Sequence, residues 1–178
     1  MYSYYAPRHK VFISFYHKDD QVYKDYIDKH LSSNIIIKSV MNGEYSTDNS
    51  DEYIKRLIRE EKISDSSVVV VLVGANTKNR KHVDWEIYAG LCPSINGNSG
   101  LIGIFLPTVR KSENGGYYYR DMPARLADNI KSEYADYYDW DYAISHFDAI
   151  VEKAFNSRKS RQKLIDNSRP QMQQNLEA

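Results

Sequence analysis

Glu86 is the residue whose type and position most readily suggest chemistry. It follows Trp85 near the start of an expected helix, and that helix comes after the apolar run 68–74. A run of β-branched residues bounded by turn formers is typical of a buried parallel strand. Because open α/β sheets bind ligands just beyond the carboxyl ends of their strands, Glu86 is the first candidate for a functional carboxylate. The competing interpretation is an ordinary solvated charge, which holds for most glutamates.

Other familiar catalytic signatures are missing from the sequence. The segment 74–78 is too short for a P-loop and lacks the Gly-Lys-Ser/Thr ending. The five histidines show no metal-ligand spacing. The single Cys92 excludes an internal disulfide and a multi-cysteine metal site. We therefore expect no metal and no resident cofactor.

The acidic pair Asp19 and Asp20 raises the alternative of a phospho-receiver domain. In that fold, paired acids after the first strand bind Mg²⁺ beside an Asp that accepts the phosphoryl group. The acceptor should end the third strand, but residues 73–76 contain no acid. The pair is therefore better explained as a cap for the helix that follows.

The totals of the sequence limit the classes of function. The 178 residues carry 24 basic and 24 acidic side chains, so no long-range field is expected to attract nucleic acid or a membrane. Hydrophobic residues make up 42%, which is enough for a core, and the sixteen tyrosines suit a semi-polar pocket or an association surface. The sequence contains no signal peptide and no apolar run of membrane-spanning length, so we expect a cytoplasmic protein.

Hydrophobic periodicity predicts strands that alternate with helices. The strands are expected over 10–16, 35–40, 68–74, 101–106 and 134–140, and the helices over 21–31, 51–62, about 80–90, 123–130 and 144–155. Such alternation predicts a parallel sheet covered on both faces, with right-handed crossovers. The expected fold is a flavodoxin-like three-layer sandwich over residues 8–157. The polar segment 158–178 is expected to be solvated helix or disorder.

Five blocks of sequence, in this order and spacing, resemble a known family. The blocks are Val11–Phe15, Ser50–Arg59, Asp65–Gly74, Arg80–Ile87 and Met122–Asn129. Together they resemble bacterial TIR-like proteins, specifically the TIR-like subunit of Thoeris anti-phage systems. The resemblance spans about residues 8–157 and implies a TIR-like five-stranded parallel sheet.

The resemblance also implies a substrate and a site. TIR enzymes consume NAD⁺ by breaking its nicotinamide–ribose bond, and they require a Glu on the helix after the third strand, which is Glu86 here. The loop after the first strand lines the pocket, which indicates Ser14, Phe15 and Asp19. The loop after the second strand gates it, which here is about Met41 to Asn49, with Asn49 taken as a substrate-binding residue.

Two further residues near Glu86 complete the expected site. Arg80 is taken as substrate-binding because it stands at the same end of the helix. Trp85, like Phe15, offers an aromatic face that can stack on the nicotinamide or adenine ring. The Trp85-Glu86 order departs from the usual Trp-Cys-containing motif of TIR helices.

The resemblance finally implies partners. The ADP-ribose part would be hydrolysed, cyclised or transferred, and the product would be an ADP-ribose-derived nucleotide, linear or cyclic with the cyclic form favoured, that activates an effector protein after infection. A phage-derived trigger and a homo-oligomer are further expected partners. The rival hypothesis is a non-catalytic TIR-like module for protein–protein interaction, because fold does not fix function. A Glu86 that faces solvent, with no adjoining cleft, would favour that rival.

Overall fold

A five-stranded parallel sheet runs through the middle of the computed structural model, which describes residues 8–41, 43–46 and 48–177. The strands are β1 (His9–Ser14), β2 (Ile35–Lys38), β3 (Val68–Val73), β4 (Gly100–Phe105) and β5 (Asp136–Asp139). Their order is β2-β1-β3-β4-β5, and every neighbouring pair is parallel. The predicted sheet is confirmed, with strand limits that differ by at most two residues.

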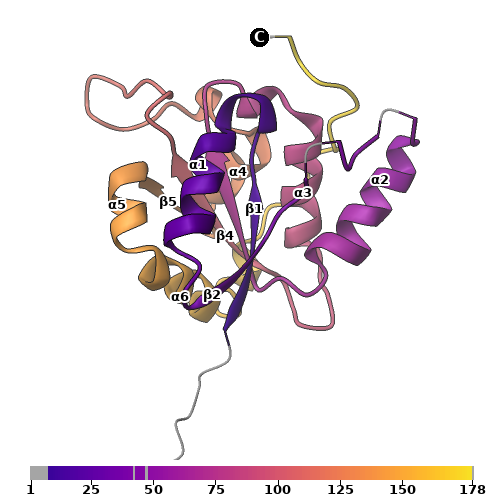
Figure 1. The fold of residues 1–178 in the computed structure, drawn as a ribbon, viewed down its shortest axis with the longest axis horizontal. Coiled ribbons are helices and arrows are strands. Elements are labelled where there is room, and N and C mark those ends of the chain that lie inside the picture. Colours follow the sequence, from indigo (N-terminus) through magenta and orange to yellow (C-terminus); the bar gives the residue numbers. More distant parts are fainter. Residues whose placement is uncertain (1–7, 42, 47, 178) are drawn as a thin grey trace, which may run out of the picture.

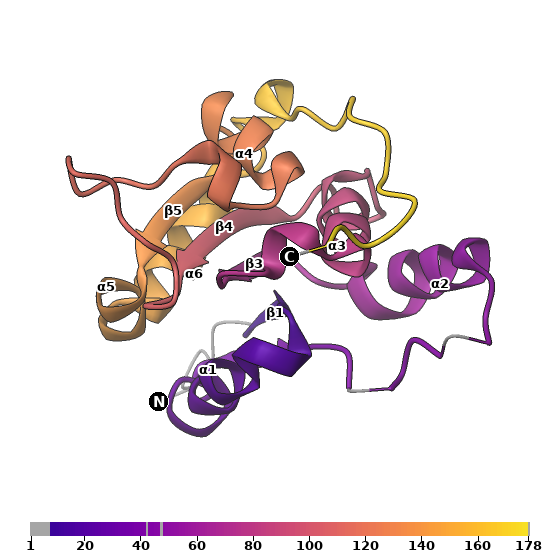
Figure 2. The ribbon, with the colours of Figure 1, turned by 90° about the horizontal axis from the view of Figure 1, so that it is seen from above.

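Helices cover both faces of this sheet (Figures 1 and 2). They are α1 (His17–His30), α2 (Asp51–Leu57), α3 (Lys81–Leu91), α4 (Ala124–Lys131), α5 (Trp140–Ser145) and α6 (Phe147–Ser157), and a π-helical turn, Ile58–Ile63, continues α2. One face packs on α1, α5 and α6, whereas the other packs on α2, α3 and α4. The predicted three-layer sandwich is therefore confirmed.

The alternation of side chains along β3 divides the core into two parts. Val69, Val71 and Val73 pack beneath α2, α3 and α4. Val68, Val70 and Leu72 pack on the opposite side. All six side chains are buried, because a central parallel strand is covered on both faces.

Gly90 allows α3 to lie close to the sheet. A Cβ atom at this position would lie 2.7 Å from Cγ2 of Val69. A glycine inside a helix lowers its stability by about 1 kcal/mol relative to alanine, and here close packing explains its presence. The approach fixes the distance between β3 and the helix that carries Glu86.

Two helix ends have local causes. Ser50 caps α2, since its Oγ accepts a hydrogen bond from the Tyr53 backbone N–H at 3.3 Å. The single final helix expected over 144–155 is wrong, because His146 leaves the helical conformation (φ −132°, ψ 25°) and separates α5 from α6. The apolar residues keep their helical spacing across His146, so the periodicity of the sequence gives no sign of the break.

The C-terminal segment differs most from expectation. Residues 158–177 follow an extended path broken by short turns, and their distal part makes hydrogen bonds to α3 and α4 (Figure 1, yellow). The expected solvated helix or disorder is therefore wrong for these residues.

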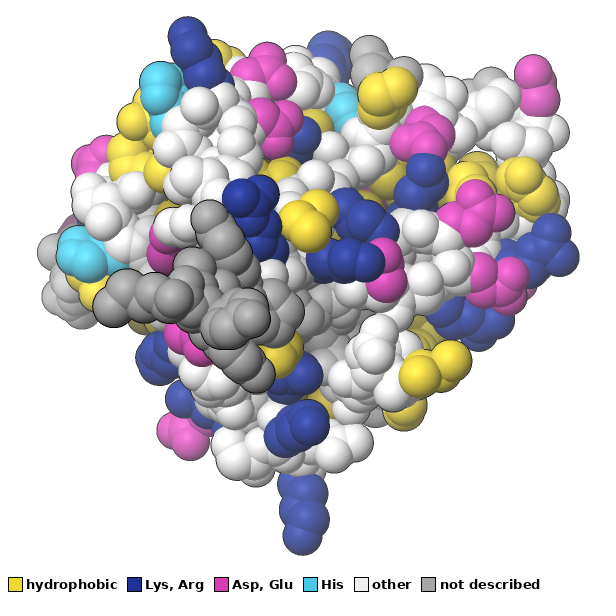
Figure 3. All heavy atoms as spheres, turned by 60° about the horizontal axis from the view of Figure 1, so that its bottom comes forward, with side chains coloured by type: hydrophobic (Ala, Val, Ile, Leu, Met, Phe, Trp, Pro, Cys, Tyr) yellow, Lys and Arg dark blue, Asp and Glu magenta, His cyan; other side chains and the backbone are white. Residues whose placement is uncertain are grey.

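The face of the molecule drawn in Figure 3 carries charges of both signs. Lys and Arg side chains are interspersed with Asp and Glu over the face drawn in Figure 3. In the described part of the chain, no helix is both long and apolar enough to cross a membrane. Met1 to Pro7 lie outside the described residues.

Candidate functional site

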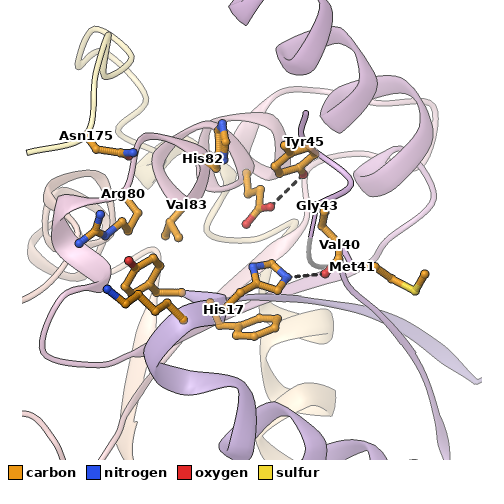
Figure 4. A pocket seen from close by; sticks show the side chains of 13 residues that line it. His17, Val40, Met41, Gly43, Tyr45, Arg80, His82, Val83 and Asn175 are labelled. Atoms are coloured by element: carbon orange, nitrogen blue, oxygen red, sulfur yellow. Dashed lines mark hydrogen bonds between the residues drawn. The ribbon is translucent and has the colours of Figure 1, made fainter. Parts of the chain in front are cut away.

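A cavity opens at the carboxyl end of β1, beside the N-terminal half of α3 (Figure 4). Its walls come from the start of α1, the loop after β2, helix α3 and the C-terminal segment. The lining residues are Phe15, Tyr16, His17, Lys18, Val40, Met41, Gly43, Tyr45, Arg80, His82, Val83, Glu86 and Asn175. The position agrees with the rule that parallel sheets bind ligands beyond the carboxyl ends of their strands.

Glu86 forms a buried polar contact at the wall of this cavity. Ser14 Oγ donates a hydrogen bond to Oε2 at 2.5 Å, and Tyr45 O–H donates to Oε1 at 2.9 Å. Ser14 shares a face of β1 with Phe12, which packs in the core beneath α3, because every second residue of a strand faces the same side. Three separate elements, β1, α3 and the loop after β2, therefore meet at one carboxyl group.

Burial controls the protonation of this carboxyl group. Desolvation raises the pKa of Glu86 to about 7, and the two hydrogen bonds oppose the rise. Burial also raises the pKa of Tyr45, and the neighbouring Glu86 raises it further, so the phenol keeps its proton and can donate it. A pKa near neutrality lets Glu86 accept a proton at physiological pH.

His82 lies one helical turn before Glu86, so both side chains belong to the same side of α3. Burial lowers the pKa of His82 to about 4, and the positive charge of Lys81 adds to this effect. The imidazole is therefore neutral at pH 7, and its ring centroid lies 4.8 Å from that of Tyr45.

Two polar atoms of the lining residues are buried without a partner. His82 Nε2 and Arg80 Nε make no hydrogen bond to any described residue. The guanidinium carbon of Arg80 lies 4.0 Å from the ring centroid of Tyr16. Buried polar groups are rarely left unpaired in native proteins, so these two atoms are suited to contact a polar ligand.

Three of the expected site residues lie with Glu86. Phe15 and Arg80 line the cavity, and Ser14 contacts Glu86 directly. Phe15 packs against His17, with ring centroids 4.3 Å apart. The nitrogen Nε2 of His17 lies 2.6 Å from the Val40 carbonyl oxygen (Figure 4), which ties α1 to the loop after β2.

The other three expected residues lie away from the cavity. Asp19 Oδ2 accepts a hydrogen bond from Asn76 Nδ2 at 2.8 Å, near the end of β3. Asn49 is exposed just before α2. Trp85 is 1% exposed, and its Nε1 donates to the Met172 carbonyl at 2.8 Å. Successive helical residues point about 100° apart, so Trp85 faces away from the wall formed by Glu86, which corrects its expected stacking role.

Several residues at the cavity were not identified from the sequence. Tyr45 lies inside the loop expected to gate the site, of which Asn42 and Thr47 lie outside the described residues. The sequence does contain a signal for His82, because residues four apart in a helix lie on the same side and His82 stands four residues before Glu86. Asn175 offers no such signal, because its contact with α3 spans more than ninety residues.

No three His, Cys, Asp or Glu side chains in the described ranges come together in a way that would hold a metal ion. The lining residues instead carry one carboxyl group, two phenol hydroxyls, two imidazoles, a guanidinium, an ammonium and a side-chain amide. These groups can bind an organic ligand that carries hydroxyl and phosphate groups.

A parallel sheet in the order β2-β1-β3-β4-β5 is the flavodoxin-like arrangement, and the buried Glu86 lies on the helix after β3. Residues 12–111 match the model of the family described as the Thoeris protein ThsB, TIR-like domain. Because the match covers more than half of the chain, the protein belongs to this family. The matched range includes Ser14, Tyr45, His82 and Glu86 and ends before the C-terminal segment.

A remote likeness exists among solved structures. The TIR domains in the structure of the activated Roq1 resistosome directly recognizing the pathogen effector XopQ align with 88% of this chain and 83% of their own chain. The identity is 14% and the TM-score is 0.38. No curated protein matches the chain.

Proposed function

We propose that this protein is an NAD⁺-consuming enzyme of anti-phage defence. It would cleave the nicotinamide–ribose bond and produce a cyclic nucleotide derived from ADP-ribose that activates a partner effector. Membership of the Thoeris ThsB family supports the role in defence. The observation that carries the enzymatic proposal is the buried Glu86 at a cavity wall, held by two hydroxyl donors.

The chemistry suits one buried carboxylate. When the bond breaks, its electron pair leaves on the nicotinamide nitrogen, which becomes neutral, and positive charge develops on the ribose as in glycoside hydrolysis. The ionised Glu86 stabilises this charge in a site of low dielectric. The oxygen of a water molecule, or a nucleophilic atom of the same substrate, then bonds to the ribose carbon. Where the attacking atom carries a proton, Glu86 accepts that proton.

Other residues at the cavity support binding of a dinucleotide. Arg80 carries a guanidinium suited to a phosphate oxygen. Phe15 supplies an aromatic side chain next to the polar groups. The neutral His82 supplies a hydrogen-bonding nitrogen that is free among the described residues.

The loop after β2 favours cyclisation over hydrolysis. Val40, Met41, Gly43 and Tyr45 all line the cavity. Tyr45 binds Glu86 through its hydroxyl group, so the loop is attached to the carboxyl group itself. Such a cover limits the access of water to the ribose cation.

The position of Glu86 weakens the rival hypothesis of a non-catalytic interaction module. That hypothesis expects a glutamate at the surface, away from any cleft. Glu86 is 4% exposed and lines a cavity. Burying a carboxyl group in this way costs folding free energy, which is difficult to explain for a module that needs only its surface.

The test is to incubate the purified protein with NAD⁺, with and without lysate from phage-infected cells, and to follow nicotinamide and nucleotide products by mass spectrometry. Glu86→Gln is the variant of interest, and Glu61→Gln is its matched control at an exposed position. We expect release with the wild type and with Glu61→Gln but not with Glu86→Gln, and the product mass identifies a hydrolase or a cyclase. No release in either condition would favour the interaction module.

A further inference from the structure

We propose that residues 166–176, here called the strap, form a positioning device for the Glu86 helix and part of the rim of the substrate cavity. Asn175 is the positioning residue at its end. The proposal rests on the function proposed above for Glu86, but the contacts that carry it lie on other residues. The strap also lies outside the range 12–111 that matches the family model.

The beginning of the strap is fixed to α4. Asn129 Nδ2 donates to the Asp166 carbonyl at 2.7 Å, and Asn129 Oδ1 accepts from the Asp166 backbone N–H at 3.0 Å. Asn129 itself is fully buried. A buried side-chain amide that satisfies both backbone groups of one residue replaces the pairing that a strand would provide.

The middle of the strap completes a buried ion pair between α3 and α4. Arg125 Nε lies 2.9 Å from Asp84 Oδ1, and the arginine is fully buried. The strap supplies the remaining partners: Asn167 Oδ1 accepts from Arg125 at 2.9 Å, the Pro170 carbonyl accepts at 3.2 Å, and the Met172 N–H donates to Asp84 at 2.8 Å. A buried ion pair is tolerated only when its other donors and acceptors are satisfied.

The strap also holds the residue directly before Glu86. The Met172 carbonyl that accepts from Trp85 Nε1 belongs to the same residue whose N–H binds Asp84. One residue of the strap therefore contacts two consecutive residues of α3. This pair of bonds limits rotation of the helix about its axis, which would move Glu86 along the cavity wall.

The end of the strap caps α3. The residue at the N-cap position, Arg80, makes no side-chain capping bond. Asn175 Oδ1 instead accepts from the Lys81 backbone N–H at 2.9 Å, and the Leu176 N–H donates to the Asn79 carbonyl at 2.9 Å. The first N–H groups of a helix have no partner within it, so a residue distant in sequence provides the cap. In Figure 4, Asn175 lies near Arg80 at one side of the cavity.

The expected consequence is an effect on substrate binding. Arg80 lies between Asn79 and Lys81, and both of these neighbours bind the strap. Loss of the cap would let the Arg80 backbone move away from the position where its guanidinium meets substrate. Small displacements of positioning groups have large effects on rate and affinity.

The test compares Asn175→Ala with Asn175→Asp. The alanine variant loses the cap, whereas the aspartate variant keeps an acceptor for the Lys81 N–H and adds a negative charge that favours a helix N-terminus. We expect Asn175→Ala to raise KM for NAD⁺ roughly fivefold with a smaller change in kcat, and Asn175→Asp to restore KM. Gln174→Ala, at an exposed neighbour, is the matched control.

Amide hydrogen exchange gives a measurement that does not depend on activity. In Asn175→Ala we expect the peptide that contains Lys81 to exchange roughly fivefold faster, and in Asn175→Asp to exchange as the wild type does. Trp85→Phe keeps an aromatic ring but removes the donor to Met172, and it should speed exchange at 172–176.

Three results would overturn the proposal. They are unchanged KM and exchange in Asn175→Ala, failure of Asn175→Asp to restore them, and a gain of activity in Asn175→Ala, which would make the strap an inhibitory cover. If the wild type releases no nicotinamide, the proposed function fails, but the exchange measurement still decides whether the strap holds α3.

Discussion

The two sides of α3 differ in how their polar groups are paired. Toward the strap, Asp84 and Trp85 find partners for their polar atoms in α4 and the C-terminal segment. Toward the cavity, the pairing is incomplete, since His82 Nε2 and the nearby Arg80 Nε have no partner among the described residues.

The comparison separates a structural side from a functional side of one helix. Buried polar groups that are hydrogen-bonded stabilise the fold. Unpaired polar groups at a cavity instead cost folding free energy, which a bound ligand can restore by pairing with them. Glu86 stands between these cases, because it is paired through both oxygens and still has a pKa raised to about 7. The same helix is therefore fixed on one side so that it can carry a reactive group on the other.

The largest expected effect is a loss of stability on the structural side of α3, where Asp84 pairs with Arg125. Arg125→Ala leaves Asp84 as a buried charge without its cation, which costs about 3–5 kcal/mol of the free energy of unfolding. Arg59→Ala is the matched control, because Arg59 forms an exposed ion pair with Glu60 that we expect to contribute less than about 1 kcal/mol. Urea denaturation measures both variants, and equal losses would contradict the distinction.

A smaller effect of opposite sign is expected on the functional side. The pKa of Glu86 is raised from 4.5 to about 7 in the folded protein, so the folded state binds this proton more tightly than the unfolded chain does. The wild type therefore loses free energy of unfolding as the pH rises from about 4.5 to about 7, and Glu86→Gln removes that loss.

Glu86→Gln should consequently be more stable than the wild type at pH 8, by about 3 kcal/mol, and close to it at pH 4.5. Thermal and urea denaturation across this range measure the difference, with Glu61→Gln as the control. A difference that does not change with pH would contradict the raised pKa.

The smallest expected effect concerns the hydroxyl donors. Tyr45→Phe removes a hydrogen bond that lowers the pKa of Glu86, so the pKa rises and turnover requires a higher pH. We expect a loss of roughly twofold to tenfold at pH 6.5, with recovery toward the wild-type rate above pH 8. Tyr118→Phe, at an exposed tyrosine, is the control, and an equal loss at every pH would show that Tyr45 acts on the substrate instead.

The fold could be predicted because its determinants are local and periodic. The six apolar residues of β3 and the Ser50 cap are visible in short stretches of sequence. The position of Glu86 follows from the same reasoning, because it depends only on the order of a strand and a helix. The break at His146 could not be predicted, since the apolar spacing continues across it.

The site could be predicted only in part, because its remaining contacts join distant segments. Tyr45 and Asn175 reach α3 from loops whose paths depend on the whole fold. Trp85 lies on the other side of the helix from the cavity, because residues adjacent in a helix point in directions about 100° apart. The polar composition of the C-terminal segment indicated solvation, whereas its polar groups satisfy the buried pair of Asp84 and Arg125.

The most direct test of the central claim is the rate of nicotinamide release from NAD⁺ as a function of pH for the wild type, Glu86→Gln and Glu61→Gln. The account predicts that the wild type and Glu61→Gln rise together through about pH 7, where Glu86 ionises. It predicts that Glu86→Gln is at least about 100-fold slower at every pH. A Glu86→Gln variant that is folded and keeps the wild-type rate and pH profile would contradict it.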